Sequence, residues 1–214
     1  QRPAAAQFLG KILQTWNAQS WNKKDKEEFL DVADNLKKRI ASITEPNGTF
    51  DMDKRTLLAG EPVTVSFSYR NASRACVAVR PVDMKRWQEE RMDKVQTSKT
   101  LGKAYKNRYS NLGNLLFSLL HDSSYARYLG EEIKGDEITL TPGNRYLNHI
   151  AHIPVPTRKP GWYLLTVTLE NGYRFHRFLT LSDMVLVRRS VPEGNLWFLA
   201  DARTGMPVEG GSLR

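Results

Sequence analysis

Four histidines and one cysteine are the side chains in this sequence that most readily bind a metal ion or act as nucleophiles. They are His121, His149, His152, His176 and Cys76. His149 and His152 are three residues apart in a segment typical of a β-strand, so their side chains are expected on opposite faces of a sheet. The sequence contains no H-E-x-x-H motif, no C-x-x-C pair and no acidic calcium loop. We therefore expect structural or surface histidines and no metal site.

The single cysteine excludes an intrachain disulfide and a metal site built from several cysteines. Cys76 lies in an apolar run, residues 75–79, that is typical of a strand. We expect a buried, inert thiol there and not a nucleophile.

Motifs of the common enzyme classes are also absent. The sequence has no G-x-S-x-G elbow, no phosphate-binding P-loop and no dinucleotide-binding glycine motif. Carboxylates are plentiful without a distinctive pair, although the two acids of a glycosidase can be far apart in sequence. We expect a non-catalytic chain without a cofactor. An enzyme of unrecognised type stays open, and a deep cleft with convergent polar groups would favour it.

Five tryptophans could instead line a surface that binds sugar or protein. They are Trp16, Trp21, Trp87, Trp162 and Trp197. Trp162 and Trp197 lie in predicted strands, where we expect packing in the core.

Composition limits the possible partners. The 214 residues, 40% of them hydrophobic, suffice for one medium domain or two small ones. No run of about 18 apolar residues is present, so no membrane-spanning helix is expected. The net charge is +9, but basic residues are mixed with acidic ones along the chain, and we expect no nucleic-acid partner.

Hydrophobic periodicity indicates which elements position these residues. Apolar residues recur at helical spacing in residues 8–16 and 29–43, which predicts a helical hairpin that ends at Pro46-Asn47-Gly48. Residues 63–70 alternate like a strand, and residues 75–80 are expected to return beside them as a β-hairpin. Residues 82–129 regain helical spacing, which predicts a helical insertion between strands.

The β pattern resumes near residue 137. Residues 150–155 lie beside prolines and are expected to form an edge or terminal strand. Residues 162–169 and 173–181 flank Asn171-Gly172, a strong hairpin signal. Residues 184–188 and 195–201 follow as two further strands, with a third, short one near Val208 and Leu213.

Those last strands are too few for a core of their own. A β-sandwich needs about seven strands and about 100 residues. We expect residues 183–214 either to pair with the preceding domain or to begin a domain that continues beyond Arg214.

The same stretch carries a recognisable motif. Asp201 begins a D-x-x-T-G-x-P-V-x-G turn, whose other members are Thr204, Gly205, Pro207, Val208 and Gly210. This motif resembles the junction between successive domains in the α-2-macroglobulin family. Residues 58–65 are similar to the P-G-x-x-V strand entry of these domains, with Ala59 in place of the usual proline. The resemblance covers about residues 50–81 and 137–214.

The resemblance implies a mainly β fold, a macroglobulin-type, immunoglobulin-like antiparallel β-sandwich, to which the periodicity adds an N-terminal helical hairpin and a helical insertion. We therefore expect an N-terminal helical segment (1–47), a sandwich (48–182) with the insertion at about 82–129, and the first strands of a following domain (183–214). The six turn residues would be structural. The family's thioester motif is absent, since Cys76 is followed by Val77-Ala78-Val79.

The function that the resemblance implies is scaffolding in a broad-spectrum protease inhibitor located outside the cytoplasm. Neighbouring domains of the same chain would be direct partners, and target proteases would be partners of the full-length parent. The alternative is an adhesion or carbohydrate-binding sandwich of a cell surface.

Overall fold

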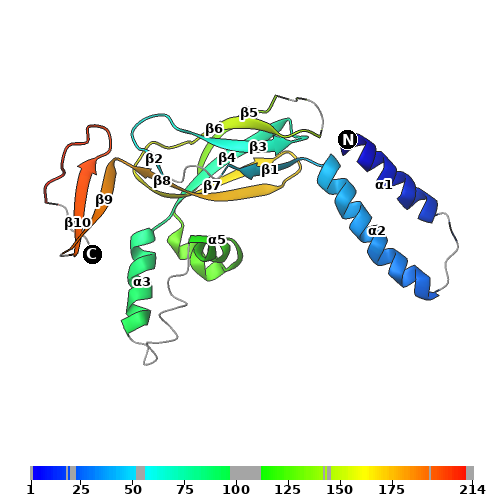
Figure 1. Cartoon of the computed structure of the whole chain (residues 1–214), viewed down its shortest axis with the longest axis horizontal. Coiled ribbons are helices and arrows are strands. Elements are labelled where there is room, and N and C mark those ends of the chain that lie inside the picture. The colour runs from blue at the N-terminus through cyan, green and yellow to red at the C-terminus, as the bar shows by residue number, and fades with distance from the viewer. Residues whose placement is uncertain are drawn as a thin grey trace.

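A computed structural model describes residues 2–17, 19, 23–51, 56–96, 112–141, 143, 146–192 and 194–210. Two helices come first, and a β-rich body follows (Figure 1). The helical elements are α1 (Arg2–Asn17), α2 (Lys23–Thr44), α3 (Met84–Gln96), α5 (Leu112–His121) and the 3-10 helix η1 (Ser123–Tyr128). The strands are β1 (Asn47–Phe50), β2 (Thr56–Leu58), β3 (Thr64–Arg70), β4 (Arg74–Pro81), β5 (Ile133–Thr139), β6 (His149–Pro154), β7 (Gly161–Leu169), β8 (Arg174–Ser182), β9 (Met184–Val191) and β10 (Gly194–Asp201).

Two sheets pack face to face in the centre of the molecule. One has the strand order β1-β3-β6 and the other β2-β8-β7-β4-β5. All pairs are antiparallel except β2 with β8. Alternate residues of both sheets, among them Phe67, Val79, Ile153 and Leu165, are fully buried between them. The predicted fold class is therefore confirmed: an antiparallel β-sandwich with a helical hairpin and a helical insertion.

One predicted pairing is wrong. Strands β3 and β4 do not form a hairpin, because β3 pairs with β1 and β6 while β4 pairs with β5 and β7. The turn at residues 71–73 carries the chain from one sheet to the other. Each strand turns its alternate apolar residues toward the opposite sheet. The free energy gained by burying them outweighs what a local hairpin pairing across the short turn would contribute.

The helical insertion covers the outer face of the five-stranded sheet. Strand β7 is buried on both faces over Tyr163, Leu164 and Leu165, a pattern typical of a strand covered on both sides. On that outer face a second cluster joins Leu164 and Phe178 of the sheet to helical residues. Those residues are Met84, Trp87, Leu115, Leu119 and Tyr128. Residues 97–111, which belong to the predicted insertion at 82–129, lie outside the described residues.

A cluster of charged residues joins two helices of this insertion. The Glu90 carboxylate of α3 accepts hydrogen bonds from Arg86 at 2.8 Å, Arg127 at 2.8 Å and the Tyr128 hydroxyl at 2.6 Å. The two guanidinium groups also lie over the Tyr128 ring, 5.9 Å and 4.8 Å from its centroid. The cluster thus ties α3 to η1.

The N-terminal helices extend from one end of the sandwich. Helix α1 packs on α2, and the last turn of α2 meets the sandwich through polar contacts. Arg70 donates to the Ser42 carbonyl, and the Asn71 amide donates to the carbonyls of Ile43 (2.7 Å) and Glu45 (3.3 Å). These contacts satisfy carbonyls that a helix end leaves without partners. No described helix is long and apolar enough to cross a membrane.

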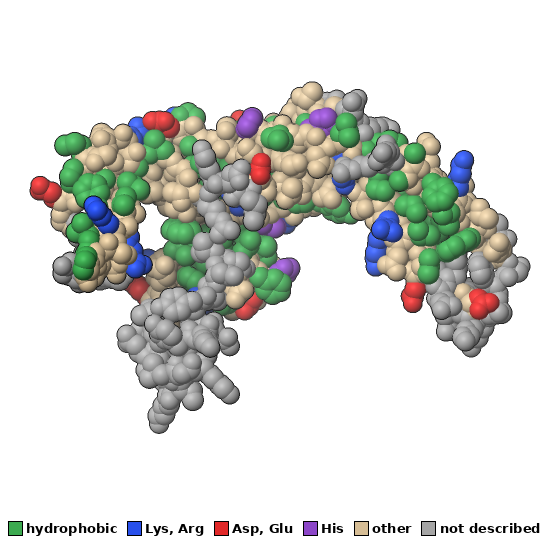
Figure 2. Space-filling view, viewed as in Figure 1, with side chains coloured by type: hydrophobic (Ala, Val, Ile, Leu, Met, Phe, Trp, Pro, Cys, Tyr) green, Lys and Arg blue, Asp and Glu red, His purple; other side chains and the backbone are tan. Residues whose placement is uncertain are grey.

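Strands β9 and β10 form a separate hairpin at the other end (Figure 1). Only Asp183 separates β8 from β9. Paired residues of an antiparallel ladder share a face, so Leu186 lies with Leu199 on one face and Val187 with Phe198 on the other. Both faces are therefore apolar, and Figure 2 shows hydrophobic side chains exposed at this end of the molecule.

Candidate functional site

The D-x-x-T-G-x-P-V-x-G motif folds into a compact turn at the end of β10. One carboxylate oxygen of Asp201 accepts hydrogen bonds from the backbone N–H of Arg203 (2.9 Å), the backbone N–H of Thr204 (2.8 Å) and the Thr204 hydroxyl (3.0 Å). These hydrogen bonds lower the pKa of Asp201. The bond from the Thr204 backbone has the largest effect, and those from the Thr204 hydroxyl and the Arg203 backbone come next. Asp201 is therefore an ionised side chain that organises the turn.

The remaining motif residues reverse the chain. Gly205 has φ +71, a left-handed conformation that favours glycine, and its N–H donates to the Asp201 carbonyl at 2.9 Å. Pro207 forms a bridge with Ala200, and the Val208 N–H donates to the Leu199 carbonyl at 3.0 Å. Gly210 has φ +73 in the next turn. The chain thus begins to pair with the free edge of β10, while Leu213, placed in the predicted last strand, lies outside the described residues.

The second motif lies against the first. Ala59 and Gly60 form the turn before β3, and the guanidinium of Arg203 reaches this turn from the C-terminal hairpin. Sequence reasoning missed Arg203, because its partner Ala59 is 144 positions away and no local pattern joins the two.

The four histidines do not form a common site, although His121 lies close enough to His176 to influence its pKa. The His149 ring lies 5.7 Å from that of Tyr69, and His121 lies 4.4 Å from the Phe117 ring. His149 and His152 pair with Tyr69 and Ser66, which puts them on opposite faces of the sheet. Within the described ranges, no three His, Cys, Asp or Glu side chains are placed to hold a metal ion.

His176 lies in β8, and a histidine with its ordinary pKa would titrate near neutral pH. Its Nδ1 lies 3.0 Å from the Thr166 hydroxyl of β7. Burial lowers the pKa of His176, and the charges of Arg174 and His121 lower it further. The neutral ring is therefore favoured, and its role is a polar contact between neighbouring strands.

Cys76 and Trp197 correct two predictions. Cys76 is exposed, because Ala75, Val77 and Val79 occupy the buried face of β4 and leave the alternate positions outside. Trp197 does not pack in a core: it is 46% exposed, and Arg188 lies 5.7 Å from its ring centroid. Trp162 is half-buried against the second cluster, in agreement with the prediction. Trp21 lies outside the described residues.

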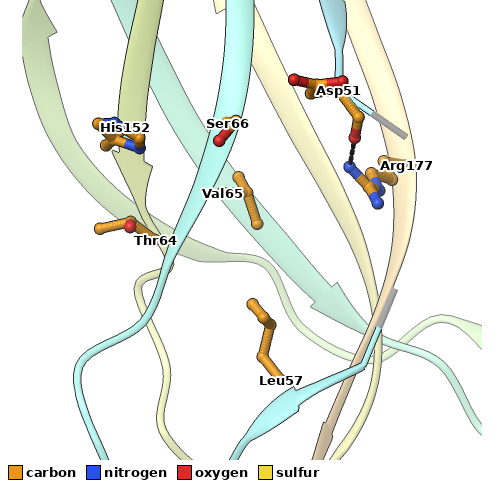
Figure 3. Close-up of a pocket in the computed structure, with 7 residues that line it drawn as sticks. All are labelled: Asp51, Leu57, Thr64, Val65, Ser66, His152 and Arg177. Carbon is orange, nitrogen blue, oxygen red and sulfur yellow. Dashed lines mark hydrogen bonds between the residues drawn. The ribbon is translucent and has the colours of Figure 1, made fainter. Parts of the chain in front are cut away.

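A pocket of about 350 Å³ opens between the two sheets. Its lining residues are Asp51, Leu57, Thr64, Val65, Ser66, His152 and Arg177 (Figure 3). Arg177 donates to the backbone carbonyl of Asp51, which holds the chain after β1 against β8. Figure 3 shows His152 and Arg177 on opposite sides of the opening. The polar groups of this lining do not converge as a nucleophile and its base would.

Comparison with known proteins gives similarity to solved structures alone. No protein-family model and no curated protein matches the chain. The crystal structure of native alpha-2-macroglobulin from Escherichia coli spanning domains NIE-MG1 is similar, with TM-score 0.48, 14% identity, and coverage of 78% of this chain and 74% of that one.

Two further structures of the same E. coli protein are similar. The crystal structure spanning MG0-NIE-MG1 has TM-score 0.46 and 14% identity over 76% of this chain and 47% of that one. The cryo-EM reconstruction of the native conformation has TM-score 0.45 and 14% identity over 76% of this chain, and this chain covers 10% of its length. At this identity and TM-score, the likeness describes a structural relationship and no activity.

Proposed function

We propose that the chain is a non-catalytic structural part of an α-2-macroglobulin-like, broad-spectrum protease inhibitor, in which it acts as scaffold. One observation carries the proposal. The motif from Asp201 to Gly210, on which the family resemblance rests, folds into an ordered turn on a hairpin that follows the sandwich after one residue. Such an arrangement suits domains strung in series along a long chain.

The proposed domains are residues 1–47 (helical segment), 48–182 (macroglobulin-type sandwich, with its insertion at about 82–129) and 183–214 (first strands of a following domain). The β9–β10 hairpin supports this division. Within the described residues it forms no ladder with either sheet of the sandwich, and both of its faces expose large apolar side chains. Two-stranded hairpins are marginal alone, and further strands would bury these faces.

The partners would be neighbouring macroglobulin-type domains of the same chain and, through the full-length parent, target proteases. The proposed location is outside the cytoplasm. Because the role is scaffolding, no residue of this chain would contact the catalytic residues of a protease.

Protease inhibition tests the proposal. The full-length parent and the 214-residue chain are each incubated with a serine, a cysteine and a metalloprotease, and digestion of a large protein substrate is measured. We expect the parent to inhibit all three classes and the 214-residue chain to inhibit none. A parent without inhibitory activity, or a 214-residue chain that inhibits by itself, would contradict the proposal.

The exposed ring of Trp197 favours one alternative, an adhesion or carbohydrate-binding module. Binding of the 214-residue chain to a glycan array decides this point. Specific binding that Trp197→Ala removes would support the alternative, and absence of binding would count against it.

A further inference from the structure

Among the described residues, two attachments join the sandwich to the β9–β10 hairpin. The first is covalent: β8 ends at Ser182 and β9 begins at Met184. A one-residue link can bend through the backbone angles of Asp183, and local contacts restrain it only in part. The Ser182 hydroxyl lies 3.2 Å from the Met184 N–H and 2.8 Å from its carbonyl.

The second attachment is the side chain of Arg203. Its Nη2 donates to the Ala59 carbonyl at 2.6 Å, and its Nη1 lies 3.1 Å from the Glu61 carboxylate. The ion pair alone would contribute little, because its two side chains are 43% and 56% exposed. The bond to the carbonyl is partly buried and charge-assisted, and the planar guanidinium holds both acceptors in one orientation.

Each side of this contact is also held by hydrogen bonds of its own. On the sandwich, the Ala59 N–H donates to the Ser182 carbonyl at 3.0 Å, and the Gly60 N–H donates to the Arg158 carbonyl at 2.8 Å. On the hairpin, the Arg203 N–H is fixed by Asp201, and the Ala202 N–H donates to the Asp183 carbonyl at 2.7 Å. The guanidinium therefore joins two ordered turns.

Gly60 makes room for this contact. Its φ is +84, and a Cβ built on it would lie 2.5 Å from Nη2 of Arg203. A side chain at position 60 would thus meet both backbone strain and the guanidinium.

We infer that Arg203 sets and holds the angle between the sandwich and the β9–β10 hairpin, with the turn from Ala59 to Glu61 as its docking surface. The one-residue link, with the hydrogen bonds at Ser182 and Asp183, restrains this angle only in part, and the Arg203 contact restrains it further. With the angle held, a rotation of the hairpin also rotates the sandwich. This inference concerns the chain itself and does not depend on protease inhibition by the parent.

Distances between two spin labels test the inference in the 214-residue chain. Cys76, exposed on β4, takes one label, and a Ser190→Cys substitution on β9 provides the second site. Double electron–electron resonance should give one narrow distance distribution for this background. With Arg203→Ala added, we expect a distribution about twofold broader or more, because the remaining one-residue link can adopt several backbone conformations.

Arg189→Ala is the matched control, since Arg189 is an exposed arginine of the same hairpin outside the joint. It should leave the distribution unchanged. The inference is overturned if Arg203→Ala keeps the background distribution, if Arg189→Ala broadens it equally, or if the background is already broad. Should Arg203→Ala fail to fold, judged by circular dichroism, Gly60→Ala decides by the same criterion, because it obstructs the contact from the sandwich side.

Discussion

At the residue scale, Glu90 shows how one carboxylate fixes the helical insertion. The hydrogen bond from the Tyr128 hydroxyl, and then that from Arg86, lowers the pKa of Glu90 below its ordinary value of 4.5. The ionised carboxylate is therefore more stable in the folded chain than in the unfolded one. This contribution is fully present above about pH 4.5 and is lost as the pH falls through the lowered folded-state pKa.

Removal of the Tyr128 hydroxyl tests this role. Tyr128→Phe keeps the buried ring and deletes two hydrogen bonds to charged groups, the one donated to Glu90 and the one accepted from Arg127. We therefore expect the free energy of unfolding at pH 7 to fall by about 2 kcal/mol. The difference from wild type should shrink below pH 4.5, where Glu90 becomes protonated in both chains. Urea denaturation at several pH values measures it.

Tyr125→Phe is the control for that series. Tyr125 lies in the same 3-10 helix, and among the described residues its hydroxyl has no hydrogen-bond partner. It should be close to wild type at every pH. An effect of Tyr128→Phe that stays constant from pH 7 to pH 3 would show that Glu90 is not involved.

At the element scale, Asn71 joins helix α2 to the sandwich. Its backbone has φ 55, the left-handed conformation that asparagine tolerates better than most residues. Its side-chain nitrogen Nδ2 donates to the Ile43 carbonyl at the end of α2, and its side-chain oxygen Oδ1 accepts from the Tyr146 N–H at 2.8 Å. One residue thus connects three segments.

Two substitutions separate these contributions. Asn71→Gly keeps the backbone conformation and removes the side chain, and we expect a loss of about 1–2 kcal/mol in the free energy of unfolding. Asn71→Ala should cost about 1 kcal/mol more, because alanine is strained in the left-handed region. Hydrogen exchange should quicken in the last turn of α2 in both variants. Wild-type protection there would show that Asn71 does not hold the helix.

The sequence predicted elements whose signals are local. The β7–β8 hairpin is marked by Asn171-Gly172, and the structure places these residues in its turn. The Asn71 cap could not be predicted, because it depends on a helix end 28 positions away. The run at 75–79 misled the assignment of Cys76, since alanine and cysteine occupy exposed positions of a strand at little cost. The turn motif was recognisable, but the position of Arg203 depended on the tertiary fold.

At the scale of the whole molecule, the five-stranded sheet is the shared layer. Its inner face packs on β1-β3-β6, and its outer face packs on the helical insertion. Phe178 and Leu179 are neighbours in β8 and are both buried, but they belong to different clusters. The two cores can therefore be weakened separately.

Phe178→Ala and Leu179→Ala form a matched pair. Each should lower the free energy of unfolding by about 3 kcal/mol, because each leaves a cavity in a packed cluster. Phe178→Ala should speed hydrogen exchange mainly in α3 and α5, whereas Leu179→Ala should speed it throughout β3, β7 and β8. If both variants give the same exchange pattern, the two clusters unfold as one unit.

The single residue between β8 and β9 also bears on how the protein responds to mechanical force. A pull on the C-terminal hairpin reaches the sandwich along the axis of β8, which lies between β7 and β2. The hydrogen bonds to the antiparallel β7 run perpendicular to the strands and those to the parallel β2 are slanted, so such a pull loads the bonds on both sides of β8 together, largely in shear. Tension is then spread over the length of the strand and is not concentrated on one bond at a time, as it would be if an edge strand were peeled away.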